Sequence, residues 1–255
     1  MRHPRKRTTM KARYIYHSCF LLENDDVILV FDYWKDPWGE LHRLLRETGK
    51  QIYVFVSHFH EDHYNPEVLE WGKEQFPTAK PVRLFVSYDT AKRRRIDKEQ
   101  ILDVMMPGKF FEDEYLKASY YRSTDIGVSV AVTMADGTTI FHAGDLNNWF
   151  FDSGEGLKVT LDEMEGMYLS VIRELMASLP RINHAMIPFD PRLEENMLRG
   201  PMQFLNKIYV DNMYPMHFWH RHGLMGEVLA QLQQLFPTTT FWYPMAVTDN
   251  QNEKI

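Results

Sequence analysis

The sequence contains a single cysteine, Cys19, among its 255 residues. An intrachain disulfide is therefore impossible, which excludes a small fold held together by disulfide bonds and fits a reducing compartment. No apolar run approaches the roughly 20 residues that a membrane-spanning helix needs, and the N-terminal MRHPRKRTTM lacks the apolar stretch of a secretory signal. These absences predict a cytoplasmic protein without a membrane partner.

Basic residues are outnumbered by acidic ones. The chain has 29 Lys and Arg against 35 Asp and Glu, a formal net charge of -6. A protein that mainly binds nucleic acid needs clustered Lys and Arg side chains, so this balance argues against a nucleic-acid partner. The run Arg93-Arg94-Arg95 is interpreted as the solvated face of a charged helix. A small-molecule substrate is the expected partner, and the oligomeric state is left open.

Linkers, internal repeats and low-complexity tracts are absent as well. We therefore expect one domain over residues 11–255. The basic segment 1–10 is expected to be a disordered leader, with Met10 as the biological start.

Apolar runs predict a mixed α+β fold, with strands first and then strands and helices interleaved, in an order that repeats once. Two such halves predict two sheets packed face to face with helices outside, a four-layer αββα sandwich. Strands are expected at 12–16, 19–23, 27–32, 51–56, 82–87, 101–105, 115–121, 127–134, 138–142, 185–189, 214–217 and 240–243, and helices at 38–47, 66–76, 91–100, 162–179, 194–208 and 226–236.

Histidine and acidic side chains are concentrated in the segment Ser57-His58-Phe59-His60-Glu61-Asp62-His63. This segment directly follows the predicted strand 51–56, so it forms a turn at the end of a buried strand. Alternate residues of an extended chain point the same way, which lets the first two histidines converge on one point while the Asp-His pair addresses a second. Imidazole and carboxylate groups suit zinc, iron or manganese. A merely polar loop is the alternative, and the ordered elements on both sides argue against it.

The pattern His-x-His-x-Asp-His after a buried strand resembles the signature of the metallo-β-lactamase fold superfamily of hydrolases. Residues 16–22, followed by Phe31-Asp32, resemble the opening strands of the subgroup related to ascorbate-phosphate lactonases. Residues 141–145, Phe-His-Ala-Gly-Asp, resemble the motif whose aspartate bridges two metals. Pro215-Met216-His217 resembles the late strand that carries the last histidine ligand. The likeness extends over nearly the whole chain from about Met10.

The resemblance implies a cofactor of two divalent metal ions, zinc or manganese with iron as a further candidate. A hydroxide held between them would attack an ester, lactone, amide or phosphodiester centre, since two cations lower the pKa of bound water and stabilise the oxyanion. It implies that His58 and His60 bind the first metal, that Asp62, His63 and His217 bind the second, and that Asp145 bridges. Asp62 and Asp145 are the predicted catalytic residues.

One departure from the family pattern concerns the first metal, which usually has a third histidine between positions 62 and 145. Beyond His63, which belongs to the motif itself, His142 is the one histidine in that interval, and its place in the strand before Gly144-Asp145 fits a strand position better than a ligand. Asp125, in the stretch 121–127, is the predicted substitute, with a turn or cap residue as the alternative. A carboxylate there would favour manganese or iron over zinc.

Four residues near the predicted site are candidates for substrate binding. Arg192 could hold an anionic group by bidentate contact, together with Asp190 at a strand end, although a rigid turn with a surface salt bridge explains both equally well. Trp149 could form a substrate wall if it is exposed or belong to the core if it is buried, and His220 could rim the pocket. His17 could orient the metal ligands, but a satisfied core histidine is the favoured interpretation.

Three functions remain open from sequence alone. The leading one is a metal-dependent hydrolase of a small soluble substrate. A nuclease or phosphodiesterase of the same superfamily is the first alternative, and a degenerate metal-binding module without catalysis, favoured only by the missing histidine, is the second. An oxidoreductase variant would need a flavin domain, for which no residues remain.

Overall fold

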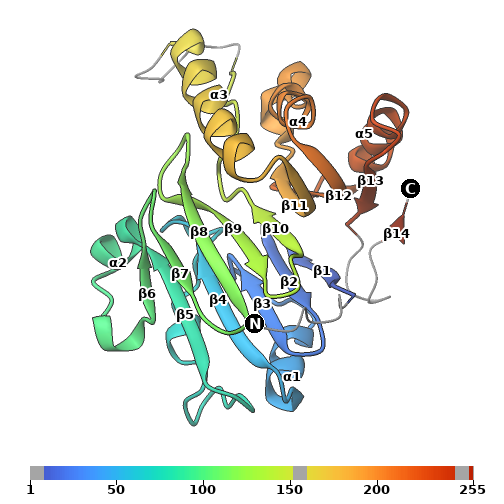
Figure 1. The fold of residues 1–255 in the computed structure, drawn as a ribbon. Helices are drawn as coiled ribbons and strands as arrows, with labels where there is room; N and C mark the ends of the chain where they lie inside the picture. The colour runs from blue at the N-terminus through green and yellow to red at the C-terminus, as the bar shows by residue number, and fades with distance from the viewer. Residues whose placement is uncertain (1–8, 152–159, 245–252, 255) are drawn as a thin grey trace, which may run out of the picture.

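The fold was analysed in a computed structural model that describes residues 9–151, 160–244 and 253–254 (Figure 1). The predicted leader lies outside the described residues apart from Thr9 and Met10, and Met10 is buried in the core. No helix among the described residues has the length and apolarity to cross a membrane.

The first sheet has six strands in the order β1-β2-β3-β4-β5-β6. Its first three strands are antiparallel neighbours, and the pairs from β3 to β6 are parallel. The strands are β1 (Lys11–Tyr16), β2 (Cys19–Glu23), β3 (Val27–Phe31), β4 (Gln51–Val56), β5 (Val82–Ser87) and β6 (Asp103–Met105).

The second sheet has eight strands in the order β14-β13-β12-β11-β10-β9-β8-β7. The strands from β10 to β13 are parallel, and antiparallel strands flank them on both sides. They are β7 (Phe110–Glu112), β8 (Leu116–Arg122), β9 (Val128–Met134), β10 (Thr139–His142), β11 (Arg181–Pro188), β12 (Tyr209–Met216), β13 (Thr240–Tyr243) and β14 (Glu253–Lys254).

The two faces of the first sheet enter different cores, as the two-residue period of a strand requires. In β3, Leu29 and Phe31 pack between the sheets, whereas Ile28 and Val30 pack outward beneath α1 (Glu40–Glu47) with its Leu41. Figure 1 shows α1 and α2 (Tyr88–Arg94) along the first sheet and α3 (Leu161–Ser178), α4 (Arg199–Leu205) and α5 (His222–Leu235) along the second. The predicted α+β arrangement of two sheets with outer helices is confirmed.

Three predicted helices are shorter than expected. The helix expected at 66–76 is a 3-10 turn, Pro66–Leu69, because Gly72 has a φ of 88° and reverses the chain. The helix expected at 91–100 ends at Arg94, because Arg95 adopts the left-handed conformation. The helix expected at 194–208 is replaced by the 3-10 segment Pro191–Asn196, which is interrupted at Glu194 by a non-helical backbone conformation (φ 49°, ψ -120°), and by α4.

Strand ends from both sheets meet along one edge of the sandwich. Because parallel strands present their carboxyl ends on the same side, side chains that follow them converge there. The segments involved are His17-Ser18 between β1 and β2, Asp32 after β3, residues 57–63 after β4, residues 123–127 between β8 and β9, residues 143–149 after β10, Asp190 after β11 and His217 after β12.

Candidate metal centre

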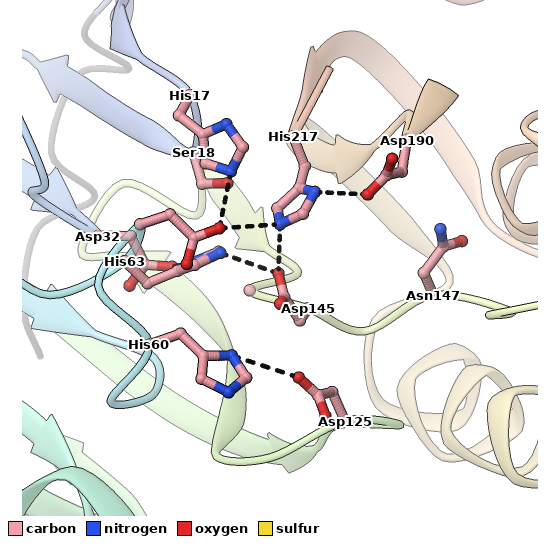
Figure 2. A network of polar contacts seen from close by, with 12 residues as sticks. His17, Ser18, Asp32, His60, His63, Asp125, Asp145, Asn147, Asp190 and His217 are labelled. Atoms are coloured by element: carbon pink, nitrogen blue, oxygen red, sulfur yellow. Dashed lines mark hydrogen bonds and ion pairs between the residues drawn. The ribbon is translucent and has the colours of Figure 1, made fainter. Parts of the chain in front are cut away.

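Four side chains gather at one end of this edge: His17, Asp62, His63 and His217. Figure 2 shows the three histidines of this set. The Asp62 Oδ2 atom lies 3.2 Å from His17 Nε2 and 3.5 Å from His217 Nε2. His17, His63 and His217 are all at most 1% exposed, whereas the Asp62 side chain is 20% exposed. This set is called the second-metal group.

A second set, the first-metal group, consists of His58, His60 and Asp125 together with Asp145. His58 Nε2 lies 3.1 Å from His60 Nδ1, and His60 Nδ1 lies 3.5 Å from Asp125 Oδ2. His58 is fully buried, but the side chains of His60 and Asp125 are 43% and 38% exposed. The first-metal group therefore faces the open side of the centre.

Asp145 stands between the two groups. Its Oδ1 atom lies 3.0 Å from His63 Nε2 and 3.4 Å from His217 Nε2, and its Oδ2 atom lies 3.4 Å from His58 Nε2. One carboxylate thus directs one oxygen toward each group, which is the arrangement that a bridging ligand needs.

The spacing of these atoms fits bound metal ions. Ligand atoms about 2.1 Å from one metal lie roughly 3.0–3.4 Å from each other in octahedral or tetrahedral geometry. The separations around Asp62 and Asp145 fall at or close to this range. Four buried atoms at the centre also have no hydrogen-bond partner among the described residues, namely Nε2 of His17, His63 and His217 and Oδ1 of Asp145. Such groups are costly unless a ligand satisfies them.

A set of outer hydrogen bonds aims the histidines inward. His63 Nδ1 donates to Asp32 Oδ2 at 2.7 Å, and His217 Nδ1 donates to Asp190 Oδ2 at 2.9 Å. The Ser57 hydroxyl donates to Asp32 at 2.6 Å and therefore accepts from His58 Nδ1 at 2.9 Å. Each of these three rings consequently carries its proton on Nδ1, which leaves the Nε2 lone pair free for a metal.

The pKa shifts of the buried histidines and carboxylates are typical of a site that binds cations. Burial disfavours charge on His63, but Asp145 and Asp32 nevertheless raise its pKa well above the ordinary value. Burial likewise opposes ionisation of Asp145, yet His63 and His217 hold its pKa well below the ordinary value. His217, although buried, has its pKa raised to about 9 by Asp145, Asp190 and Asp62. Without metal, protons on the histidines balance the carboxylates.

Asp125 and His17 differ from these residues. Burial and the nearby carboxylate of Asp145 raise the pKa of Asp125, since the two acids repel each other. Burial lowers the pKa of His17 to about 4, so its ring is neutral near pH 7 and can offer a lone pair. A bound cation would offset the repulsion between the two acids and would accept the lone pair of the neutral His17 ring.

The structure brings together all seven predicted metal ligands, His58, His60, Asp62, His63, Asp125, Asp145 and His217. His142 lies outside the centre, as its strand position predicts. Its Nε2 donates to the Ser18 carbonyl at 2.8 Å, and its Nδ1 accepts from the Gly144 amide at 3.1 Å. With both nitrogens engaged, His142 has no lone pair for a metal.

Two predicted substrate-binding residues need correction. Asp190 is fully buried, and its carboxylate accepts from His217 and pairs with Arg192, so it positions a ligand instead of contacting substrate. Trp149 is only 7% exposed, and its Nε1 donates to the Asp145 carbonyl at 3.0 Å. Its ring centroid lies 5.8 Å from that of His217, which makes it packing around the centre and not an exposed wall.

The other two candidates remain near the site. Arg192 forms the ion pair with Asp190 that the alternative interpretation predicted, and its guanidinium lies 5.2 Å from the Trp219 ring centroid. Half of its side chain is exposed. His220 is exposed, with its ring centroid 6.3 Å from that of Tyr16. Their part in substrate binding stays a prediction.

His17 is the residue whose place the sequence interpretation missed. Its φ is 55°, a strained value for a residue with a side chain, and such strain is often retained at functional sites. The Tyr14 hydroxyl accepts from its backbone amide at 2.7 Å, and its carbonyl accepts from the His217 amide at 3.3 Å. A turn histidine between two strands of the opening hairpin was the available signal.

A family model described as "Beta-lactamase superfamily domain" matches residues 11–162. The matched region contains the whole first-metal group, Asp145, and all of the second-metal group except His217. No curated protein matches the sequence.

Solved structures with the same fold come from several organisms. Igni18, a metallo hydrolase from Ignicoccus hospitalis, is 14% identical with a TM-score of 0.63, and the match covers 96% of this chain and 98% of that one. YhfI, a metallo-beta-lactamase fold protein from Bacillus subtilis, is 12% identical with a TM-score of 0.58, covering 91% and 96%. CmlA, a diiron beta-hydroxylase from Streptomyces venezuelae, is 11% identical with a TM-score of 0.58, covering 98% of this chain but 54% of CmlA.

Proposed function

The chain belongs to the beta-lactamase superfamily of the metallo-β-lactamase fold, and from that premise we propose that it is a hydrolase dependent on two divalent metal ions. Its substrate is a small soluble ester, lactone or phosphodiester. The subgroup related to ascorbate-phosphate lactonases supplies one analogy for the substrate. We also propose that the chain forms a single domain and is cytoplasmic.

The observation that carries the proposal is the position of Asp145. Its two oxygens face two different groups of ligand atoms, each group at least half histidine. A structural zinc site closes around one metal with four protein ligands. A carboxylate shared between two sets, with one set partly exposed, supports a two-metal centre that has room for substrate.

Two metal ions bound here would lower the pKa of water and polarise the bond to be cleaved. The residues of the chain hold and orient that centre. Asp32 and Asp190 fix the rings of His63 and His217, and Trp149 covers one side of His217 and keeps it dry. The proposed reaction uses no cysteine nucleophile. Cys19 is buried, and burial raises the pKa of its thiol.

The ligand types favour different chemistry at the two positions. The first-metal group offers two imidazoles and two carboxylates, because Asp125 stands where a histidine is usual. The second-metal group offers three imidazoles and the Asp62 carboxylate because His17 joins it, and the shared Asp145 adds a second carboxylate there. We propose that His17 is a ligand of the second metal. The centre then has as many histidine ligands as the family pattern, with one fewer at the first metal and one more at the second. An oxygen-rich first site favours manganese or iron.

We predict that His17→Ala and Asp125→Ala each weaken the binding of a different metal. Either variant should retain one metal at wild-type affinity and bind the other at least tenfold more weakly, because each removes one ligand from one group. Metal titration followed by elemental analysis measures both affinities.

Cobalt(II) substitution provides the control for this pair of variants. Proton NMR of the cobalt protein shows a shifted ring N–H signal from each coordinated imidazole, and His17→Ala should remove one of them while Asp125→Ala removes none. Two metals bound with unchanged affinity in both variants, and an unchanged number of shifted signals in His17→Ala, would contradict both assignments.

Hydrolysis assays test the proposed function directly. The chain should be stripped of metal, reloaded separately with manganese, zinc and iron, and assayed with aryl esters, a series of small lactones and bis-p-nitrophenyl phosphate. Metal-dependent turnover of any of these supports the proposal. Cleavage of RNA at comparable rates would favour a nuclease, and stoichiometric metal binding without turnover on any substrate would favour a module without catalysis.

A further inference from the structure

A cleft of about 520 Å³ adjoins the metal centre but contains none of its ligands. It lies between the loop that follows β3 and the loop that carries the histidine motif. Clefts of roughly 300–1,000 Å³ are typical of small-molecule sites. The side chains that matter for its chemistry are Trp34, Lys35, Glu61, Tyr64, Asn65 and Arg94.

The cleft connects to the second-metal group through Trp34. The Trp34 ring centroid lies 5.5 Å from that of His17, and Glu61 directly precedes Asp62 in the chain. The Asn65 side chain donates to the main-chain carbonyl of Trp34 at 2.9 Å, and the Trp34 ring centroid lies 5.3 Å from that of Tyr16. A molecule in the cleft would therefore lie against an indole that contacts the second-metal group.

Two cations line the cleft and have no acidic partner in the part of the chain that the structure describes. Lys35 Nζ lies 4.0 Å from the Trp34 ring centroid, and the Arg94 guanidinium donates to the Phe59 carbonyl at 2.7 Å. Neither Lys35 nor Arg94 forms an ion pair with any carboxylate within the described ranges, in contrast to the paired Arg13. A guanidinium has five N–H donors, and an ammonium has three, so most donors of this pair are available.

This local charge is opposite to that of the whole chain, which has a net charge of -6. We infer that the cleft binds the anionic head group of a small organic molecule, a phosphate or a carboxylate, through Lys35 and Arg94, with the body of the molecule against Trp34. The inference rests on the proposed function and specifies its substrate class. Glu61 lines the same cleft, and its carboxylate would repel the anionic head group.

Binding to the metal-depleted chain tests this inference independently of catalysis, because no metal can then hold the anion. Isothermal titration with phenyl phosphate, benzoate and benzyl alcohol should show binding of the two anions and none of the neutral alcohol. The combined variant Lys35→Ala with Arg94→Ala should weaken anion binding at least tenfold, and Glu61→Gln should strengthen it severalfold. The ratio of the two anion affinities identifies phosphate or carboxylate as the preferred head group.

Arg93→Ala is the matched control. Arg93 neighbours Arg94 on α2 and lies 5.2 Å from the Phe59 ring, but it does not line the cleft, so its loss should leave the affinity unchanged. The variants must also unfold like the wild type. Anions that fail to bind the metal-depleted wild type, or that bind the double variant as tightly, would overturn the inference. Anion binding by a chain inactive in every hydrolysis assay would uphold the cleft and reject the proposed reaction.

Discussion

Asp145→Asn is expected to abolish the binding of both metals and to lower hydrolytic turnover by about a thousandfold or more. An asparagine is neutral and has one side-chain oxygen, so it cannot direct an anionic oxygen to both ligand groups as Asp145 does. A loss of about 4 kcal/mol of transition-state stabilisation corresponds to three factors of ten in rate. The change should therefore exceed that of either His17→Ala or Asp125→Ala, which each affect one group.

Metal stoichiometry and kcat/KM should be measured together for this variant. Asp25→Asn is the matched control, since Asp25 is exposed in the turn between β2 and β3, and it should behave like the wild type. Asp145→Asn protein that binds two metals as tightly as the wild type would remove the bridging role and, with it, the main support for a two-metal centre.

The order of strands and the position of the metal motif could be predicted from the sequence because both are local patterns. The run 51–56 is apolar at every position except its first, as a strand buried on both faces requires, and β4 occupies those residues. The histidines follow it without a gap. Their convergence was predictable because it depends on neighbours along one strand and turn.

The contacts that complete the centre are long-range and escaped prediction. Asp32 reaches Ser57 and His63 across 25 and 31 residues, because β3 and β4 are adjacent parallel strands. His17 reaches His217 because the β1–β2 turn abuts the end of β12 from the other sheet. No local periodicity encodes the packing of one sheet edge on another, so Asp32 was given no role in the site and His17 was weighed only as an orienting residue or a core histidine.

The contacts of the buried residue Asp190 could not be predicted for a related reason. Asp190 ends a strand on the expected face, which is all that a sequence can indicate, but the direction of its carboxylate depends on His217 from the next strand. The three shortened helices reflect single backbone conformations at Gly72, Arg95 and Glu194, which propensities averaged over a window do not detect.

Gly127→Ala should cause a large loss of stability, about 2–6 kcal/mol in the free energy of unfolding. Gly127 has a φ of 77°, and an added Cβ would lie 2.1 Å from the Ser57 carbonyl oxygen and 2.6 Å from His58 Cβ. The backbone strain costs about 1–3 kcal/mol, and overpacking against rigid neighbours costs about 1–3 kcal/mol more. The Ser57 carbonyl also accepts from the Val128 amide at 3.0 Å, so it cannot move away freely.

Gly137→Ala separates the two costs. Gly137 has a φ of 86° in the turn between β9 and β10, but nothing lies within 4 Å of its added Cβ, so this variant should lose only the strain component, about 1–3 kcal/mol. Urea unfolding of the metal-depleted proteins compares the pair. Because the clash displaces His58, Gly127→Ala should also bind the first metal more weakly, whereas Gly137→Ala should bind both metals like the wild type. Equal stabilities and equal metal affinities in the two variants would show that the chain segment after Val56 can yield to the added methyl group, and that the tight contact at Gly127 does not hold His58 in place.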